Sequence, residues 1–271
     1  MPEGLFPEPK LVENIRELLL NRRFDEPYVS ERYVKEKIAP LYPETEFIGK
    51  GTEYIVVGHP ENSEKVVAFK YPKSFGHPLQ ALEIYHFHRF FNTLFPHNFP
   101  RFYASFGGEK PFTVREKIHS GYTKTVRYPF SEVKKTCKAL GISLSVDDSK
   151  GNFIIGSDGG QYFIDTVKNI NSSIFWEKFN ANKLKSHMEK NGITGKREKV
   201  VWSSLRRLRE LEVVFAGQCY IEEPDKIPEQ WQSNPQEFWQ ELCTKEGFGM
   251  SDPQDIASRN RIIKTIRLFE S

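Results

Sequence analysis

Three oxygen-bearing side chains in the stretch from residue 141 to 167, those of Asp147, Asn152 and Asp165, are of the types that bind magnesium. Magnesium takes hard oxygen ligands such as carboxylates, and it completes its coordination with water and phosphate oxygens. Asp147 comes five residues before Asn152 on the incoming loop, and so is near enough in the chain to reach the same place. These residues predict a site that handles a metal-bound phosphate.

A β-hairpin would bring Asn152 and Asp165 together. Short apolar runs at 153–155 and 162–164 flank an Asp-Gly pair, which is a strong signal for a hairpin turn. If this pair forms a two-residue turn, Asn152 faces Asp165 across the ladder, with Cα atoms roughly 5 Å apart. A longer turn would shift this register.

A second group of residues is suited to binding phosphate. The run 47–57 is typical of a strand, a glycine turn and a strand, and its Gly49 and Gly51 let the backbone approach a ligand and present amides to phosphate oxygens. An ordinary hairpin would also use glycine here. Lys70 ends the next β-type run, 64–70, either as a rim residue or pointing inward if it is paired.

Glu83 is the predicted partner of Lys70. It lies in a predicted helix, 78–94, on the face that carries Phe87 and Phe90. A carboxylate among aromatic side chains is costly unless a cation pairs with it. The alternative is that Glu83 lies at the edge of the stripe and reaches water.

The elements that must position these residues predict an α+β fold. Further β-type runs at 102–106 and 112–118 complete a five-stranded antiparallel sheet with one inserted helix. An N-terminal helical extension is predicted for residues 1–45, and a helical stripe from residue 126 stops at Gly141. The chain after residue 170 is predicted to be mainly helical, with helices at 174–190, 199–216, 235–244 and 252–269.

Composition indicates a folded globule. The chain has 271 residues, of which 38% are hydrophobic and 14% aromatic, and this argues against a disordered tail. Three cysteines are too few and too scattered for a disulfide framework or a zinc site. No stretch approaches the roughly 20 apolar residues of a membrane span. We expect a cytoplasmic protein, or one secreted into a host cell without a cleaved signal peptide, with neither a membrane nor a nucleic acid as partner.

A basic stretch between residues 196 and 209 has two interpretations. It is either a solvated helix face or a site for an acidic partner or phosphate. Its basic residues are Lys196, Arg197, Lys199, Arg206, Arg207 and Arg209.

Between residues 47 and 167 the chain resembles the protein-kinase-like superfamily. Gly49-Lys50-Gly51 with Val56 looks like the glycine-rich loop, and Val67-Ala68-Phe69-Lys70 is similar to the Val-Ala-x-Lys strand. Glu83 is similar to the helix glutamate that pairs with that lysine.

The polar residues of the 141–167 stretch extend the resemblance. Asp147 and Asn152 match the catalytic-loop spacing Asp-x-x-x-x-Asn, and Asp165, which follows 13 residues later, matches the metal-binding Asp of Asp-Phe-Gly.

The resemblance implies a bilobal fold that binds ATP and Mg²⁺. Residues 46–118 would form the N-lobe, and residues 119–271 would form a mainly helical, divergent C-lobe. Lys70 would contact the phosphates, Gly49 to Gly51 would cover them, and the backbone from Glu116 to Ile118 would bind adenine. Asn152 and Asp165 would hold the metal, and Asp147 would accept the proton of the substrate hydroxyl.

The departures from the family pattern keep several functions open. Tyr54 replaces the third glycine, Ser145-Val146 replace His-Arg, and Thr166-Val167 replace Phe-Gly. The overall look is similar to the compact, divergent protein kinases that bacterial pathogens inject as effectors. The main expectation is a kinase that phosphorylates Ser or Thr hydroxyls of a protein substrate. The alternatives are a small-molecule kinase of the same superfamily, a pseudokinase interaction scaffold, and an enzyme that transfers another part of ATP, such as AMP.

Overall fold

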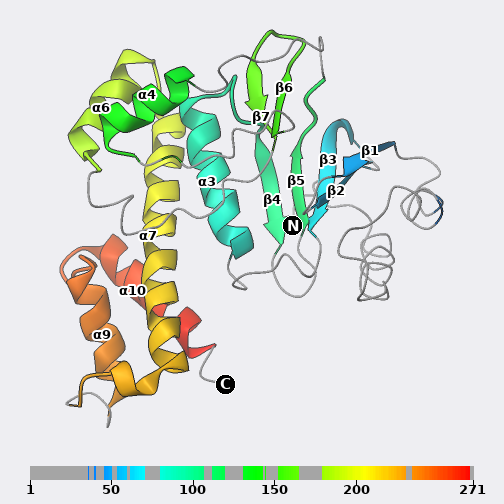
Figure 1. Ribbon diagram of the computed structural model, residues 1–271. Helices are drawn as coiled ribbons and strands as arrows, with labels where there is room; N and C mark the ends of the chain where they lie inside the picture. Colours follow the sequence, from blue (N-terminus) through cyan, green and yellow to red (C-terminus); the bar gives the residue numbers. More distant parts are fainter. Residues whose placement is uncertain are drawn as a thin grey trace. The chain divides into compact units, whose positions relative to one another are not determined.

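The chain is α+β, as predicted, with a five-stranded antiparallel sheet, a two-stranded hairpin and six α-helices in its described part (Figure 1). It divides into two compact units, Met1–Val201 and Trp202–Ser271, and the predicted lobe boundary after residue 118 falls inside the first. Apart from residues 36 and 40, the predicted extension 1–45 lies outside the described residues. The computed structural model describes residues 36, 40, 46–50, 54–59, 62–70, 80–106, 112–119, 131–142, 144, 152–164, 179–229 and 234–268.

The sheet of the first unit is built from runs rich in β-branched and aromatic residues, which favour extended backbone. Its strand order is β1-β2-β3-β5-β4, and every neighbouring pair is antiparallel. Helix α3, Gln80–Leu94, lies between β3 and β4 in the chain, so the predicted sheet with one inserted helix is confirmed. The strands are β1 (Phe47–Lys50), β2 (Tyr54–His59), β3 (Asn62–Lys70), β4 (Phe102–Phe106) and β5 (Phe112–Glu116).

Aromatic packing holds α3 against β4. Phe90 and Phe91 are completely buried, and the ring of Phe91 stacks on that of Phe99 with centroids 5.0 Å apart. His88, which is also completely buried, stacks on Phe102 at 3.9 Å. Burying a large side chain contributes about 2 kcal/mol to stability. The apolar face predicted for this helix is therefore the face that makes the core.

Of two further helices in the first unit, α4 ends where the sequence predicts and α6 begins later than predicted. Helix α4, Ser131–Leu140, is followed by Gly141, whose φ of 75° is the left-handed conformation that ends many helices. Helix α6, Ala181–Lys190, is capped by Asn180, whose side chain accepts a hydrogen bond from the Lys183 N–H. The predicted helix 174–190 is therefore wrong at residues 179 and 180, which are not helical because Asn180 adopts the extended conformation of a cap, and its residues 174–178 lie outside the described part of the chain.

The second unit is helical, as predicted for the chain after residue 170. Helix α7, Lys196–Glu222, begins in the first unit and is longer than the predicted span 199–216. It passes Gly217 without a break, and this glycine allows α10 to pack closely, because a Cβ there would lie 2.6 Å from the Cδ1 of Ile266. The other elements are the 3₁₀ turn η5 (Pro224–Lys226), α9 (Pro235–Lys245) and α10 (Pro253–Arg267).

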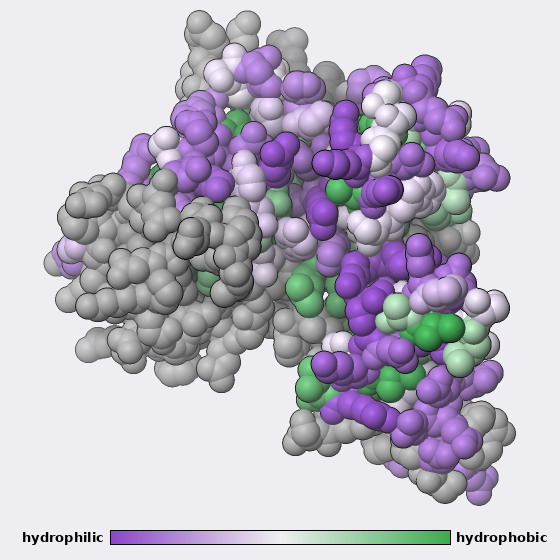
Figure 2. All heavy atoms as spheres, turned by 180° about the vertical axis from the view of Figure 1, so that it is seen from behind, coloured by the Kyte–Doolittle hydropathy of each residue, from purple (hydrophilic) through white to green (hydrophobic). Residues whose placement is uncertain are grey.

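The surface hydropathy, the helices and the cysteines can be compared with what the composition predicts. Hydrophilic residues predominate on the face drawn in Figure 2, and hydrophobic residues appear there as separate patches. Of the helices in the described ranges, none combines the length and apolar character needed to cross a bilayer. Cys137, Cys219 and Cys243 are all free thiols, as predicted.

Candidate functional site

The hairpin that follows Asn152 has a different register from the one predicted. Strand β6, Phe153–Ile155, pairs with β7, Gln161–Phe163, and Phe153 faces Phe163. One step further out, the Ile164 N–H donates to the Asn152 carbonyl at 2.9 Å. Asn152 therefore faces Ile164, and the predicted pairing of Asn152 with Asp165 is wrong by one residue.

The cause is a three-residue turn in place of a two-residue turn. The Gly156 N–H donates to the Gly160 carbonyl at 2.9 Å, and Gly159 between them has a φ of 79°. Asp158 stabilises this turn, because its Oδ1 accepts from the Gly160 N–H at 2.9 Å and its Oδ2 accepts from the Tyr162 hydroxyl at 2.7 Å. A type I turn closed by a left-handed glycine is the usual three-residue hairpin loop.

Backbone hydrogen bonds dock the hairpin onto the segments that follow α3 and β5. The Phe163 N–H donates to the Asn98 carbonyl at 2.9 Å, and the Asn98 side chain donates to the Gln161 carbonyl at 3.1 Å. At the turn, the Ser157 N–H donates to the His119 carbonyl at 2.8 Å. The hairpin that carries Asn152 is therefore held to the rest of the first unit through β7 and through its turn.

The predicted phosphate-binding residues occupy neighbouring strands. Gly49 in β1 faces Val56 in β2, and Val56 in turn faces Ala68 in β3. Lys70 ends β3 with its Cα paired to that of Tyr54. The side chains of Lys50 and Lys70 are outside the described part, as are the whole of Gly51, Asp147 and Asp165.

Backbone hydrogen bonds hold the segment that follows β5, where the sequence predicts the adenine-binding backbone. The Glu116 N–H donates to the Arg101 carbonyl and the Lys117 N–H to the Glu64 carbonyl, both at 2.8 Å. The Ile118 N–H makes no hydrogen bond to any residue that the structure describes. Two successive amides thus fix the segment that leads to Ile118.

Glu83 is half-buried on α3, in the apolar setting that the sequence predicts. Burial raises the pKa of its carboxyl to about 7. A carboxyl with this pKa is partly protonated at neutral pH, and a nearby cation would lower the pKa again. Whether Lys70 supplies that cation stays a prediction.

Arg115 is a residue of this region that the sequence analysis missed. Its side chain is buried in β5, where Nε donates to Thr113 Oγ1 at 2.7 Å and Nη1 donates to the Ile164 carbonyl at 3.0 Å. Its guanidinium lies 4.9 Å from the ring centroid of Tyr54 and 4.6 Å from that of Phe102. The strand sequence, FTVRE, also contains Thr and Glu, so it gave no clear signal of a buried arginine.

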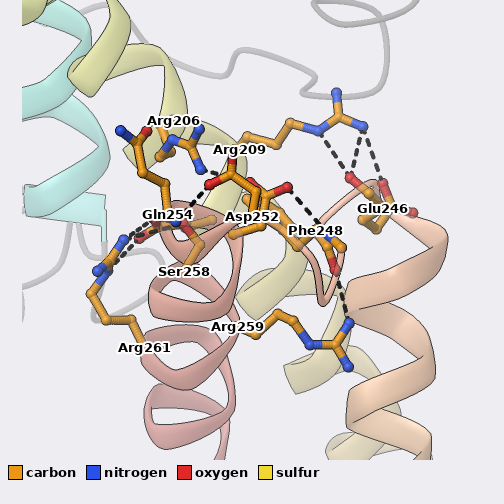
Figure 3. Close-up of polar contacts among 12 residues, drawn as sticks. Arg206, Arg209, Glu246, Phe248, Asp252, Gln254, Ser258, Arg259 and Arg261 are labelled. Atoms are coloured by element: carbon orange, nitrogen blue, oxygen red, sulfur yellow. Dashed lines mark hydrogen bonds and ion pairs between the residues drawn. The ribbon is translucent and has the colours of Figure 1, made fainter.

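Three arginines of the basic stretch are paired inside the second unit, and Figure 3 shows two of them, Arg206 and Arg209. Each bonds a carboxylate of its own unit, and neither interpretation of the stretch foresaw this role. Arg206 and Arg209 bond residues far along the chain, whereas Arg207 bonds a residue of its own helix. The pairs are Arg206 with Asp255 at 2.7 Å, Arg207 with Glu210 at 2.6 Å, and Arg209 with Glu246 at 3.8 Å.

Glu210 is the centre of this arrangement. It is almost completely buried and accepts hydrogen bonds from Arg207, from Arg261 and from the hydroxyl of Ser258. Burial alone would raise the pKa of its carboxyl, but the hydrogen bonds from Arg261, Ser258 and Arg207 outweigh burial and lower the pKa.

Replacing Glu210 by glutamine is expected to destabilise the protein by about 2 kcal/mol at pH 7, because charge-assisted hydrogen bonds are lost. A carboxyl with a lowered folded-state pKa stabilises the fold above its unfolded pKa, and this contribution disappears as the pH falls. The difference between wild type and Glu210→Gln should therefore shrink in acid, which urea unfolding at several pH values measures. The exposed Glu241 of the same unit is the matched control, and equal losses for both variants would contradict this role for Glu210.

Comparison with protein-family models yields no match, and comparison with curated proteins also yields none. The assignment of a function therefore depends on the residues of this chain and their arrangement. The described residues supply a sheet whose first strand contains Gly49, a segment after β5 that backbone hydrogen bonds hold in place, and a docked hairpin that carries Asn152.

Proposed function

We propose that the chain is an ATP- and magnesium-dependent phosphotransferase with a bilobal protein-kinase-like fold, and that it phosphorylates Ser or Thr hydroxyls of a protein. The observation that supports it best is the connection order of the first unit. Gly49, Val56 and Lys70 lie on three neighbouring strands, α3 with Glu83 follows the third strand, and Ile118 follows the fifth. This is the arrangement of sheet and inserted helix that the resemblance implies.

The donor set suits magnesium by its chemistry. An amide oxygen from Asn152 and a carboxylate from Asp165 are hard ligands of the kind that bind Mg²⁺ together with water and phosphate. When bound, the metal would neutralise charge on the phosphate oxygens. The corrected register puts Asn152 opposite Ile164, which is the residue before Asp165 in the chain.

The remaining residues would position the reactants. Phosphoryl transfer asks the protein mainly for orientation and charge neutralisation. Lys70, held by Glu83, would contact the α and β phosphates, and the Gly49 and Gly51 amides would cover them. The oxygen of the substrate hydroxyl would bond to the γ phosphorus while the bond from that phosphorus to ADP breaks. Asp147 would accept the proton that the hydroxyl loses.

A thermal-shift and labelling experiment tests this proposal. The protein is incubated with ATP labelled at the γ phosphate, with and without Mg²⁺, first alone and then with a host-cell protein extract. We expect a magnesium-dependent rise in melting temperature and label on protein. Label only with a metabolite library would indicate a small-molecule kinase, and label only from ATP labelled at the α phosphate would indicate transfer of AMP. An unchanged melting temperature with ATP and Mg²⁺ would reject the enzyme and favour a scaffold.

A further inference from the structure

Arg115 makes an unusual set of contacts for a strand residue. Only 5% of its surface is exposed, and a guanidinium in such a place is costly unless its donors find acceptors. Thr113, two residues earlier on the same face of β5, accepts from its Nε at 2.7 Å. The rings of Tyr54 in β2 and Phe102 in β4 contact the guanidinium as well. Arg115 is thus fixed by strands on both sides of β5 and has a defined position.

The acceptor of its other hydrogen bond lies outside the sheet. Arg115 Nη1 donates to the Ile164 carbonyl at 3.0 Å, and the Ile164 N–H donates to the Asn152 carbonyl at 2.9 Å. Both backbone polar groups of Ile164 are therefore bonded, one to the sheet and one to the residue that we propose as a metal ligand. The carbonyl of Ile164 belongs to the peptide group that leads into Asp165.

Peptide planarity gives this hydrogen bond a consequence. The carbonyl carbon and oxygen of one residue lie in a plane with the nitrogen and Cα of the next residue. A donor that fixes the direction of the Ile164 carbonyl therefore also orients the plane from which Asp165 starts. Groups that orient metal ligands in this way typically affect metal affinity or activity 10-fold to 100-fold when they are removed.

We propose that Arg115 is a positioning residue, which holds Ile164 and, through the Ile164 peptide, the backbone of Asn152, and so sets the affinity of the nucleotide site for magnesium. This inference rests on the proposed function. It assigns to a side chain in β5 a part in metal binding that the sequence motifs do not contain. A merely structural arginine would affect stability and leave the magnesium requirement unchanged.

The test compares Arg115→Met with wild type. The readout is the magnesium concentration that gives half of the ATP-induced rise in melting temperature, together with the rise that ATP gives without magnesium. We expect Arg115→Met to need about 10-fold to 100-fold more magnesium. The magnesium-free response should be unchanged, because the Ile118 amide is retained. Hydrogen exchange of the Ile164 amide should also become faster than in wild type, whatever the ligand.

Two further variants keep the test decisive. Arg115→Lys keeps a buried cation but lacks the fork of donors, so we expect a smaller increase in the magnesium requirement than for Arg115→Met. If Arg115→Met does not fold, Arg115→Lys tests the positioning role in its place. Arg89→Met makes the same change on α3, where the guanidinium lies 5.9 Å from the Tyr85 ring centroid, and should behave like wild type.

The outcomes separate this inference from the proposed function. If wild type responds to magnesium and ATP while the folded Arg115 variants need no more magnesium than wild type, the positioning role is overturned and the proposed function stands. If wild type itself shows no magnesium-dependent response, both are overturned. A raised magnesium requirement in Arg115→Met, with Arg89→Met unchanged, supports both.

Discussion

Asp165→Ala is expected to lose magnesium-dependent phosphoryl transfer by a factor on the order of 10³, because several kcal/mol of charge stabilisation by the metal disappear and each 1.36 kcal/mol is tenfold in rate. The thermal stability without nucleotide should stay close to that of wild type. The measurement is the initial rate of transfer from γ-labelled ATP at saturating Mg²⁺, with the melting temperature recorded beside it.

Asp225→Ala is the matched control for this prediction. Asp225 is exposed in the second unit, so its replacement removes the same charge from the chain without touching the candidate site. We expect this variant to keep the wild-type rate. An Asp165→Ala protein that keeps full transfer activity would reject Asp165 as the metal ligand and, with it, the mechanism proposed above.

Local patterns were sufficient to predict most elements. The strands follow from β-branched and aromatic runs, and α3 follows from an aromatic stripe at helical spacing whose members Phe87 and Phe90 are buried. The end of α4 at Gly141 follows from a glycine that adopts positive φ. Each of these signals depends on residues close in the chain, which is why the sequence alone contains them.

The candidate site was harder to predict because its register depends on the length of one turn. The hairpin turn is one residue longer than predicted, since Asp158 bonds the Gly160 amide and the Tyr162 hydroxyl, and its Oδ2 also lies 3.2 Å from His97 Nδ1. An Asp-Gly pair is compatible with both turn lengths, so the register could not be chosen from the sequence. A one-residue shift changes which residue faces Asn152.

Arg115 and the basic stretch illustrate the same limit. Arginine is a surface residue by default, and only tertiary contacts reveal that Arg115 is buried against Tyr54, Phe102 and the Ile164 carbonyl. In the second unit, Arg206 and Arg209 of α7 bond Asp255 of α10 and Glu246 next to α9, which lie far along the chain. Charge clustering in a sequence therefore does not distinguish an internal network from an external binding face.

Glu83→Gln is expected to raise the stability of the nucleotide-free protein above neutral pH while it lowers activity. Burial raises the pKa of Glu83 from its ordinary value of 4.5 to about 7. The native state therefore binds the proton more tightly than the unfolded state does, so this group makes stability fall as the pH rises between these two values and stay level above them. The loss at pH 8 is on the order of 3 kcal/mol, and glutamine avoids it.

Activity should change in the opposite direction. If Glu83 holds Lys70 at the phosphates, a neutral amide leaves the lysine poorly placed, and a misplacement of about 1 Å costs on the order of 10²-fold in rate. Urea unfolding from pH 5 to pH 8 and transfer assays at pH 8 measure the two effects on the same preparation. Glu189→Gln, at an exposed position of α6, should change neither.

The sign of the stability change at pH 8 is what makes the Glu83 experiment informative. A more stable, less active variant means that the carboxylate is retained at a cost to the fold because ATP binding or transfer needs its charge. A less stable variant would contradict the prediction, because it would mean that a cation already neutralises Glu83 before nucleotide binds. A more stable variant with full activity would leave Lys70 without a functional partner in Glu83 and would remove α3 from the proposed mechanism.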